Sequence, residues 1–312
     1  MKPAEFWVRE DVYYTYACKN CEQETGEANI VKAAKEPALL PGSFASAEAV
    51  AHIMTQKFVM YSPLYRLQQE FERQGLKLSR QTMANWLLNT SEKWLRPVYD
   101  TLREQLCKEP VLHADETTLQ VLKEPGRSST SKSYMWLYRT SGCAKQAIVL
   151  YEYQPTRKAE HAEHFLKGFS GWLHADGYQG YHKLPGNIRV VARTAPKSAL
   201  GKAIHYLLEQ WSCLTRYLED GRLELSNNRA ERSMKPFVMG RKNWLFANTP
   251  GGAQASSVIY SLIETAKANG LDPYRYLLWL LQNAPQLSET DEAWAEKLLP
   301  ANAPEECYIP QK

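Results

Sequence analysis

The sequence Leu-His-Ala-Asp occurs twice in this chain of 312 residues, as Leu112–Asp115 and as Leu173–Asp176. Each copy ends an apolar run that is short enough for a buried strand. Aspartate disfavours strands and is costly to bury without a partner, so we expect two strand ends to deliver Asp115 and Asp176 to one site. Paired carboxylates hold two Mg²⁺ ions in phosphoryl-transfer enzymes. The structural alternative is that each aspartate simply opens a turn.

A histidine precedes each aspartate by two positions. His113 and His174 therefore share a strand face with Asp115 and Asp176, because side chains alternate along a strand. Each histidine could orient its aspartate or could pack in the core. We do not expect either of them to bind metal directly, since Mg²⁺ favours oxygen ligands.

A third carboxylate is available in Ser226–Arg232. In a helix that begins at Asn228, the side chains of Asn228, Glu231 and Arg232 share one face. Neighbouring arginines keep such a carboxylate ionised. Asn228 followed by Glu231 also fits a capping box, which is the structural alternative.

The chain is strongly basic around Glu231. Residues 221–243 hold six Lys or Arg against two Glu, and aromatic residues lie among and after them. This composition suits a polyanionic substrate better than a small metabolite, although a solvated basic helix would show the same pattern. The candidates for phosphate contacts are Asn228, Arg232, Arg241 and Lys242.

Five stretches closely resemble transposases of the insertion sequence 66 family: VLHADET, LHADGYQGY, PKSALGKAIHY, NNRAERSMKPFVMGRKNWLF and VIYSLIETAKANGLDPYRYL. The resemblance runs from about Tyr16 to the C-terminus. It implies a ribonuclease H-like α/β fold and a triad of Asp115, Asp176 and Glu231 that binds Mg²⁺ or Mn²⁺. It also implies DNA strand cleavage and transfer, with transposon ends as the DNA partner and a homo-oligomer as the active form.

The chain departs from the family pattern in two places. Members of the family resemble one another in a Cys-Trp-Ala-His stretch and a long helical segment after the strand that follows the second aspartate, and here Arg193 is separated from Pro196 by only two residues. The family's N-terminal region also extends further upstream than Met1. We therefore expect a shortened copy. Two alternatives stay open: a DNA-binding, catalytically impaired remnant, and a metal-dependent nuclease unrelated to transposition.

Four regions are expected along the chain. Residues 1–42 form a partial zinc-ribbon-like segment, in which Cys18 and Cys21 make only half of a four-ligand zinc site, so we do not expect bound Zn²⁺. Residues 43–107 form a helical region. Its helix, Gly turn and Ser-capped helix outline a helix-turn-helix, in which Arg80 and Gln81 would reach a DNA groove; a bundle that braces the core is the alternative.

Residues 108–270 form the mixed-sheet core, and residues 271–312 form a C-terminal helix and acidic tail. In the core we expect three strands as a meander, then alternating helices and strands. One helix should separate the strands at 171–175 and 188–193, and another should span 199–217. We expect the tail from Pro285 to wrap loosely over the surface.

Composition limits the class of protein. Hydrophobic content of 44% and charged content of 23% are typical of a globular protein. No apolar run approaches the roughly 20 residues of a membrane span, and six scattered cysteines do not make a disulfide framework. We expect a cytoplasmic protein without a membrane partner.

Overall fold

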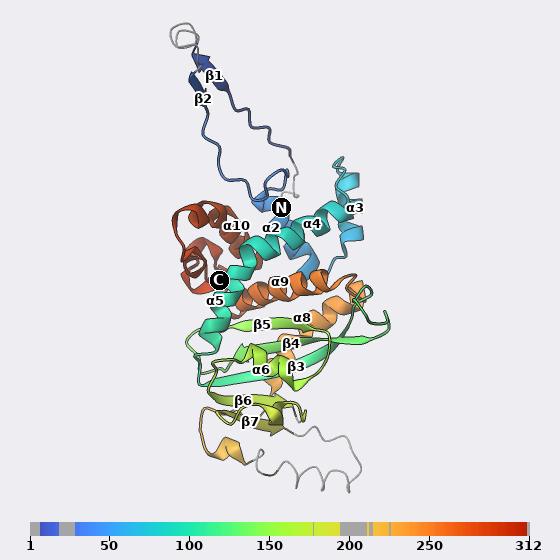
Figure 1. Ribbon diagram of the computed structural model, residues 1–312, viewed down its shortest axis with the longest axis vertical. Coiled ribbons are helices and arrows are strands. Elements are labelled where there is room, and N and C mark those ends of the chain that lie inside the picture. Colours follow the sequence, from blue (N-terminus) through green and yellow to red (C-terminus); the bar gives the residue numbers. More distant parts are fainter. Residues whose placement is uncertain are drawn as a thin grey trace.

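The computed structural model describes residues 7–18, 29–176, 178–193, 211, 215–224 and 226–310. A mixed β-sheet lies at one end of the main body, and a layer of helices lies at the other (Figure 1). One hydrophobic core of buried residues runs continuously through the helical layer and the sheet.

The central sheet has five strands in the order β5-β4-β3-β6-β7. Strands β3, β4 and β5 form an antiparallel meander, β6 then adds parallel to β3, and β7 adds parallel to β6. This is the mixed sheet that the sequence predicted. The strands are β3 (Val111–Gln120), β4 (Lys132–Thr140), β5 (Val149–Gln154), β6 (Gly171–Asp176) and β7 (Ile188–Arg193).

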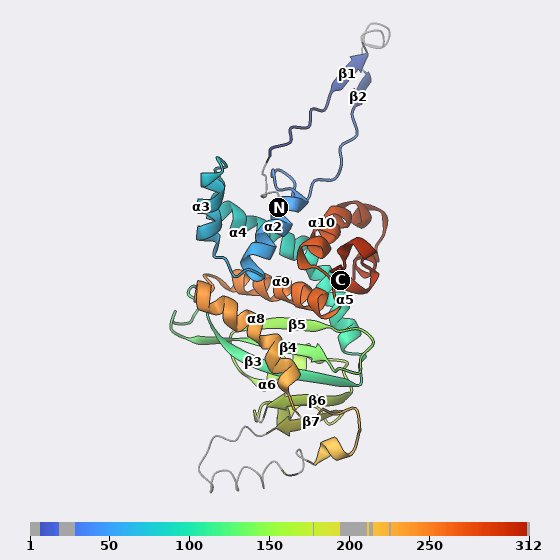
Figure 2. The same ribbon diagram turned by 180° about the vertical axis from the view of Figure 1, so that it is seen from behind.

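Helices cover both faces of this sheet. Helix α6 (Ala159–Phe165) packs on one face, where Phe165 stacks on Tyr138 of β4. Helix α8 (Asn228–Trp244) crosses β3 and β4 on the other face, as a comparison of Figures 1 and 2 shows. The two faces of β3 therefore meet different surroundings.

Helix α9 (Pro250–Ala268) closes the outer edge of the sheet along β5. The backbone N–H groups of Val149 and Tyr151 donate to the hydroxyls of Thr265 and Ser261, at 3.0 and 2.7 Å. An exposed strand edge would present these groups to another chain. Hydroxyl side chains on α9 satisfy them instead, and this fixes the helical layer to the sheet.

The helical layer contains α2 (Ala47–Phe58), α3 (Leu64–Arg73), α4 (Arg80–Thr90), η1 (Ser91–Leu95), α5 (Arg96–Leu106) and α10 (Pro273–Thr290). The predicted N-caps are confirmed: Ser46 and Ser79 accept hydrogen bonds from the amides of Ala49 and Thr82. Gly75, at a φ of +83°, ends the turn after α3 as expected. The expected helix from Ser91 to Leu106 is present, but its first five residues form a π-helical turn continuous with α4.

Two predictions about the second half of the chain are wrong. Only a short 3₁₀ turn, η2 (Tyr181–Lys183), lies between β6 and β7 in place of the expected helix. The tail from Pro285 does not wrap loosely, because α10 continues through Pro285 and Leu298, Leu299 and Cys307 are buried. The tail's acidic composition masked these apolar anchors, which lie around α11 (Trp294–Lys297), η4 (Pro300–Asn302) and η5 (Glu305–Cys307).

The helix expected at 199–217 lies mostly outside the described residues, and its described end is the 3₁₀ turn η3 (Arg216–Leu218). Near the N-terminus, β1 (Thr15–Cys18) and β2 (Asn29–Lys32) pair antiparallel in a hairpin that projects from the helical layer (Figure 1). Cys18 is exposed there, and Cys21 lies outside the described residues. A zinc ribbon is not shown. In the part of the chain that the structure describes, no helix has the length and apolar character that crossing a membrane requires.

Candidate active site

The two Leu-His-Ala-Asp segments lie side by side on β3 and β6. These strands pair in parallel with His113 opposite His174, so Asp115 and Asp176 follow two residues further along on the same face. The predicted neighbouring strands are therefore confirmed. The repeat explains this register: Leu112 pairs with Leu173 and His113 with His174, so each aspartate lies the same number of residues beyond a paired position.

The two histidines form a neutral layer beneath the aspartates. Their rings stack with centroids 4.7 Å apart, and both are buried. Burial and the neighbouring His174 lower the pKa of His113 to about 4, and burial also lowers the pKa of His174. His113 Nδ1 lies 3.2 Å from Oδ1 of Asn227, and no hydrogen bond between His113 and Asp115 is present. The two histidines therefore pack against each other and do not orient the aspartates, and His113 contacts Asn227.

Asp115 lies inside β3, not at its end, so both the expected strand end and the turn alternative are wrong for this residue. The antiparallel pairing with β4 continues to Gln120, whereas the ladder to β6 stops at His113. Asp115 therefore lies where one neighbouring strand ends, and among the described residues its Oδ1 accepts a hydrogen bond from the amide of Glu116, at 2.8 Å. Burial, together with the charges of Glu116, Asp176 and Glu231, raises the pKa of Asp115 to about 7.

Asp176 does end its strand, and here the turn prediction is confirmed. Its Oδ1 accepts the amide of Tyr178 at 3.1 Å, which is the local geometry of an Asx turn. Its other carboxylate oxygen lies 3.5 Å from Nη2 of Arg157, and the side chain is 49% exposed. Asp176 is thus more accessible than Asp115 and already faces a cation.

Glu116 is a buried carboxylate that the sequence analysis did not single out. It follows Asp115 and so points to the α6 face, where its side chain is 1% exposed. Arg157 forms an ion pair with it, and the hydroxyl of Tyr181 donates to its Oε2 at 2.6 Å. The only signal in the sequence was a Glu inside a strand, and its partners are 41 and 65 residues away.

Glu231 lies in the first turn of α8, the helix that covers the Asp115 face. Its side chain is exposed, and its charge contributes to the raised pKa of Asp115. The helix begins at Asn228 as predicted, but the structural alternative of a capping box is wrong: Asn227 is the N-cap residue, and its side chain forms no cap hydrogen bond.

Asn227, which the sequence analysis also missed, fastens the start of α8 to β3. Its side chain is buried, and its Nδ2 donates to the carbonyl of Ala114 at 2.9 Å while its Oδ1 faces His113. The side chain of Asn227 therefore contacts both His113 and Ala114, the two residues that precede Asp115 in β3. This contact sets the position of the first turn of α8 and hence of Glu231.

The three predicted carboxylates do not form a compact ligand cluster. No group of three His, Cys, Asp or Glu side chains within metal-binding reach occurs among the described residues. The oxygen donors nevertheless fit a hard divalent cation, and Asp115 is a half-buried carboxyl group to which no described Lys or Arg is paired. Burial is the largest cause of its raised pKa, and the charges of the neighbouring carboxylates add to it.

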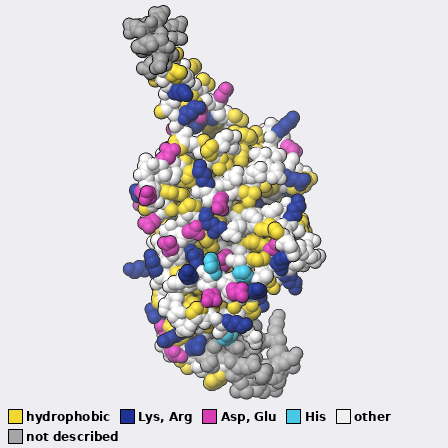
Figure 3. All heavy atoms as spheres, in the orientation of Figure 1, with side chains coloured by type: hydrophobic (Ala, Val, Ile, Leu, Met, Phe, Trp, Pro, Cys, Tyr) yellow, Lys and Arg dark blue, Asp and Glu magenta, His cyan; other side chains and the backbone are white. Residues whose placement is uncertain are grey.

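The predicted DNA-contacting residues lie in two places. Asn228, Arg232 and Lys242 are exposed on α8, whereas the guanidinium of Arg241 donates to the hydroxyl of Thr118 at 3.1 Å. Arg80 and Gln81 are exposed at the start of α4, in the helical layer and away from the sheet (Figures 1 and 2). On the face of the molecule shown in Figure 3, basic and acidic side chains are interspersed, and no patch of one sign stands out.

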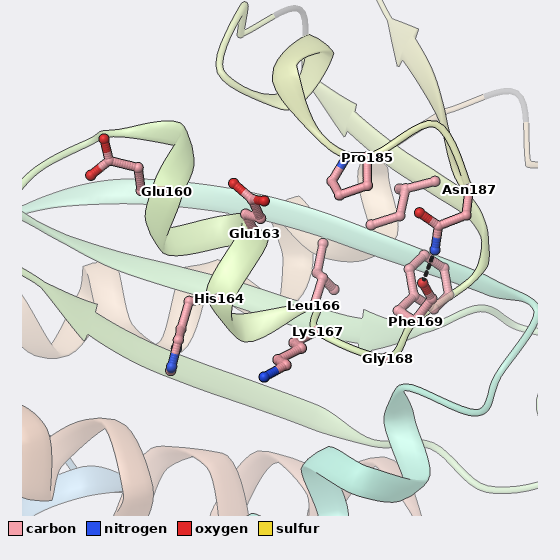
Figure 4. A pocket seen from close by; sticks show the side chains of 10 residues that line it. Glu160, Glu163, His164, Leu166, Lys167, Gly168, Phe169, Pro185 and Asn187 are labelled. Carbon is pink, nitrogen blue, oxygen red and sulfur yellow. Dashed lines mark hydrogen bonds between the residues drawn. The ribbon is translucent and has the colours of Figure 1, made fainter.

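A cavity of about 500 Å³ lies between α6 and the loop before β7, away from the three carboxylates. Glu160, Glu163 and Lys167 stand around it, and the side-chain amide of Asn187 donates to the carbonyl of Phe169 at its wall (Figure 4). Its charges are mixed, and nothing in its lining points to a particular ligand.

Comparison with known families decides the relationship of the chain. A sequence model described as "Transposase IS66 family" matches residues 42–192 and 186–255, and one described as "IS66 C-terminal element" matches residues 261–301. The chain belongs to the IS66 transposase family. The family resemblance inferred from the sequence is thereby confirmed.

Curated relatives of this IS66-family chain include three proteins of Sinorhizobium fredii (strain NBRC 101917 / NGR234), each described as uncharacterized. Protein y4jD is 30% identical and aligns with 96% of this chain and 73% of its own length. Proteins y4qI and y4hP are 26% and 23% identical, with 85% and 88% of this chain aligned. The chain covers only 64% and 65% of these two proteins.

Among solved structures, the chain is similar to two described as "Crystal structure of the Mos1 Strand Transfer Complex" and "Crystal structure of a pre-cleavage Mos1 transpososome". The sequence identities are 10% and 11%, and each match covers 92% of this chain and 85% of the other. The TM-scores are 0.22 and 0.20.

Proposed function

We propose that this IS66-family chain is an Asp-Asp-Glu transposase that cleaves and transfers DNA strands with Mg²⁺ or Mn²⁺, on a ribonuclease H-like core. The observation that carries the proposal is that Asp115 and Asp176 each follow, by two residues, the paired His113 and His174 on adjacent parallel strands, and that the helix bearing Glu231 crosses β3. The strand order supports the fold assignment, because the first carboxylate is on the first core strand, the second follows the fourth strand, and the third is on a late helix.

Asp115, Asp176 and Glu231 would hold the cations. When bound, divalent cations activate the attacking water or 3′-hydroxyl and stabilise the leaving oxygen. The chain's own contribution is to hold the carboxylates: β3 and β6 fix the two aspartates, and Asn227 fixes the start of the helix that carries Glu231. Asp115 must lose its proton to bind a cation, and a pKa near 7 lets it do so near neutral pH.

The exposed position of Glu231 is compatible with this role. Without cations, three carboxylates repel one another, and the side chain most free to move takes up the separation. Glu231 is the exposed member of the three, and its helix is tied to β3 only four residues earlier, at Asn227.

A strand-cleavage and strand-transfer assay on labelled terminal-repeat DNA, with and without Mg²⁺, tests the proposal. We expect Mg²⁺-dependent product that falls on the order of 10²-fold or more in each of Asp115→Ala, Asp176→Ala and Glu231→Ala, beyond the 10–100-fold typical of residues that only support ligands. Glu289→Ala, an exposed carboxylate on α10, is the matched control and should keep full activity. Normal strand transfer in any triad variant would refute the mechanism.

The second candidate is a remnant that binds DNA without cutting it. The absence of a compact ligand cluster among the described residues favours it. The same assay separates the two functions, because the remnant would retain terminal DNA without any Mg²⁺-dependent product.

A further inference from the structure

A small cavity of about 200 Å³ lies between β4 and the start of α8. The residues that line it are all polar or charged: Arg139, Glu224, Ser226, Asn228, Arg229 and Arg232. Pockets for drug-sized ligands usually measure about 300–1,000 Å³. This cavity therefore fits a single small polar group and not a base or a cofactor.

Three arginines line the cavity against a single carboxylate, so its lining has a net positive charge. Its one carboxylate, Glu224, is already paired with Arg229 at 2.7 Å and also accepts the amide of Gly142 at 3.3 Å. Two arginines remain without a carboxylate among the described residues: Arg139 and Arg232.

Arg139 is held in place by neutral groups. Its Nε donates to the carbonyl of Thr140 at 3.2 Å, and its Nη1 donates to the hydroxyl of Ser233. Burial and the charge of Arg229 lower the pKa of Arg139 to about 10, so it stays protonated at neutral pH. The charge of Glu224 partly offsets that of Arg139, but Glu224 forms its ion pair with Arg229, and no described carboxylate pairs with Arg139 itself. An anionic ligand would offset the remaining cost of this partly buried cation.

The position of Arg139 connects the cavity to the chemistry. Arg139 is the cross-strand partner of His113, and His113 precedes Asp115 by two residues on the same face of β3. The backbone of Arg139 therefore lies about 7 Å along the strand from the level of Asp115, taking about 3.4 Å per residue. Arginine forks bind phosphate oxygens in a bidentate manner, which neither water nor a small neutral molecule would exploit.

We propose that this arginine pocket binds one phosphodiester group of the DNA strand, next to the phosphate at which Asp115, Asp176 and Glu231 act. The proposal rests on the proposed function and adds to it Arg139 and Arg229 as phosphate-binding residues. Arg232, at the start of the second turn of α8, is the third arginine that lines the pocket. The three arginines share one phosphate.

The test measures the affinity of the full chain for duplex DNA against salt concentration, without divalent metal. One shared phosphate contributes about 0.9 to the slope of log K against log salt. We expect Arg232→Gln and Arg139→Gln each to make the slope shallower by up to about 0.9, and the double variant to shift it by no more than about 0.9. Arg275→Gln, an exposed arginine on α10, is the matched control and should leave the slope unchanged.

Additivity decides the outcome. A double variant that shifts the slope by about 1.8 would mean that each arginine meets its own phosphate, and an unshifted slope would mean that neither meets DNA; both results overturn the pocket. If Arg139→Gln does not fold, as circular dichroism would show, the pair Arg229→Gln and Arg232→Gln provides the same comparison. Glu224→Gln, which removes the only carboxylate, should strengthen DNA binding without changing the slope.

Inorganic phosphate separates a DNA phosphate from a free one. We expect phosphate to displace DNA from the unaltered chain better than chloride does at equal ionic strength, and to lose this advantage in the double variant. Phosphate binding to the pocket with an unchanged DNA slope in the variants would overturn the assignment to DNA. Because no step uses metal, failure of the triad mechanism would leave these results unaffected.

Discussion

Asp115 and Glu116 are adjacent carboxylates on one strand that meet opposite environments. Glu116 points to the α6 face, where Arg157 and Tyr181 bind it and it is almost fully buried. Asp115 points to the α8 face, receives only a backbone hydrogen bond and has a pKa raised to about 7. Arg157 pairs with Glu116 and also reaches Asp176 at 3.5 Å, whereas no described Lys or Arg pairs with Asp115, which a cation from outside would stabilise.

The contrast extends over both faces. On the α8 face, Arg139 and Arg232 form no ion pair with a described carboxylate, and Glu231 is exposed. On the α6 face, stacked aromatic rings, including Tyr138 on Phe165, enclose the charged pair. We infer that the α6 face stabilises the sheet and that the α8 face binds ligands, and the following variants test this division.

The largest expected effect is loss of the cation on the α6 face. Arg157→Gln leaves the buried Glu116 without its counter-charge, and breaking a buried pair in this way costs about 3 kcal/mol or more. Urea denaturation measures the free energy of unfolding. The double variant Arg157→Gln/Glu116→Gln should recover most of the loss, because it removes the stranded charge. A loss below about 1 kcal/mol in the single variant would show that the pair is not structural.

A pH dependence is expected from Glu152 of β5, on the same face as Glu116. Burial raises its pKa to about 7, and its Oε2 has no hydrogen-bond partner. The folded chain therefore keeps a proton that the unfolded chain loses above its ordinary pKa of 4.5, so stability falls as the pH rises from about 4.5 to 7. The loss should approach about 2–3 kcal/mol.

Glu152→Gln should remove this dependence, so that urea midpoints at pH 5 and pH 8 differ less than in the unaltered chain. Glu289→Gln, an exposed carboxylate on α10, should leave the dependence in place. An unchanged pH profile in Glu152→Gln would mean that other buried groups cause it.

A smaller stability effect is expected on the α8 face, at Asn227. Asn227→Ala removes the buried hydrogen bond to the carbonyl of Ala114 and should cost about 1–2 kcal/mol. Because the same contact positions the helix of Glu231, strand transfer should fall by about 10–100-fold. Asn228→Ala, the exposed neighbour, should change the free energy of unfolding by less than about 0.5 kcal/mol. Equal losses in the free energy of unfolding for Asn227→Ala and Asn228→Ala would contradict the positioning role of Asn227.

Local sequence predicted what depends on neighbours in the chain. The repeated Leu-His-Ala-Asp placed Asp115 and Asp176 in register, and Ser46 and Ser79 marked helix starts correctly. The residues around Glu231 suggested a third carboxylate, and the family resemblance supported that choice, whose role stays a prediction. These features follow from spacing, capping chemistry and strand alternation, all of which are read within a few residues.

Features that depend on distant partners were missed. The pair of Glu116 with Arg157 joins residues 41 apart, and Asn227 contacts a strand 113 residues earlier. Asp115 was expected at a strand end because its local sequence could not show that β4 continues alongside it while β6 stops. The apolar anchors of the C-terminal region were hidden in an acidic composition.

The most direct test of the α8-face assignment is metal-induced stabilisation of the chain without DNA. The thermal unfolding midpoint should rise with Mn²⁺ or Mg²⁺, on the order of 3 °C at about ten times the Kd. We predict that Asp115→Asn abolishes this rise, whereas Glu116→Gln, the neighbouring carboxylate on the other face, keeps it. A full metal-dependent rise in Asp115→Asn, or its loss only in Glu116→Gln, would contradict the account.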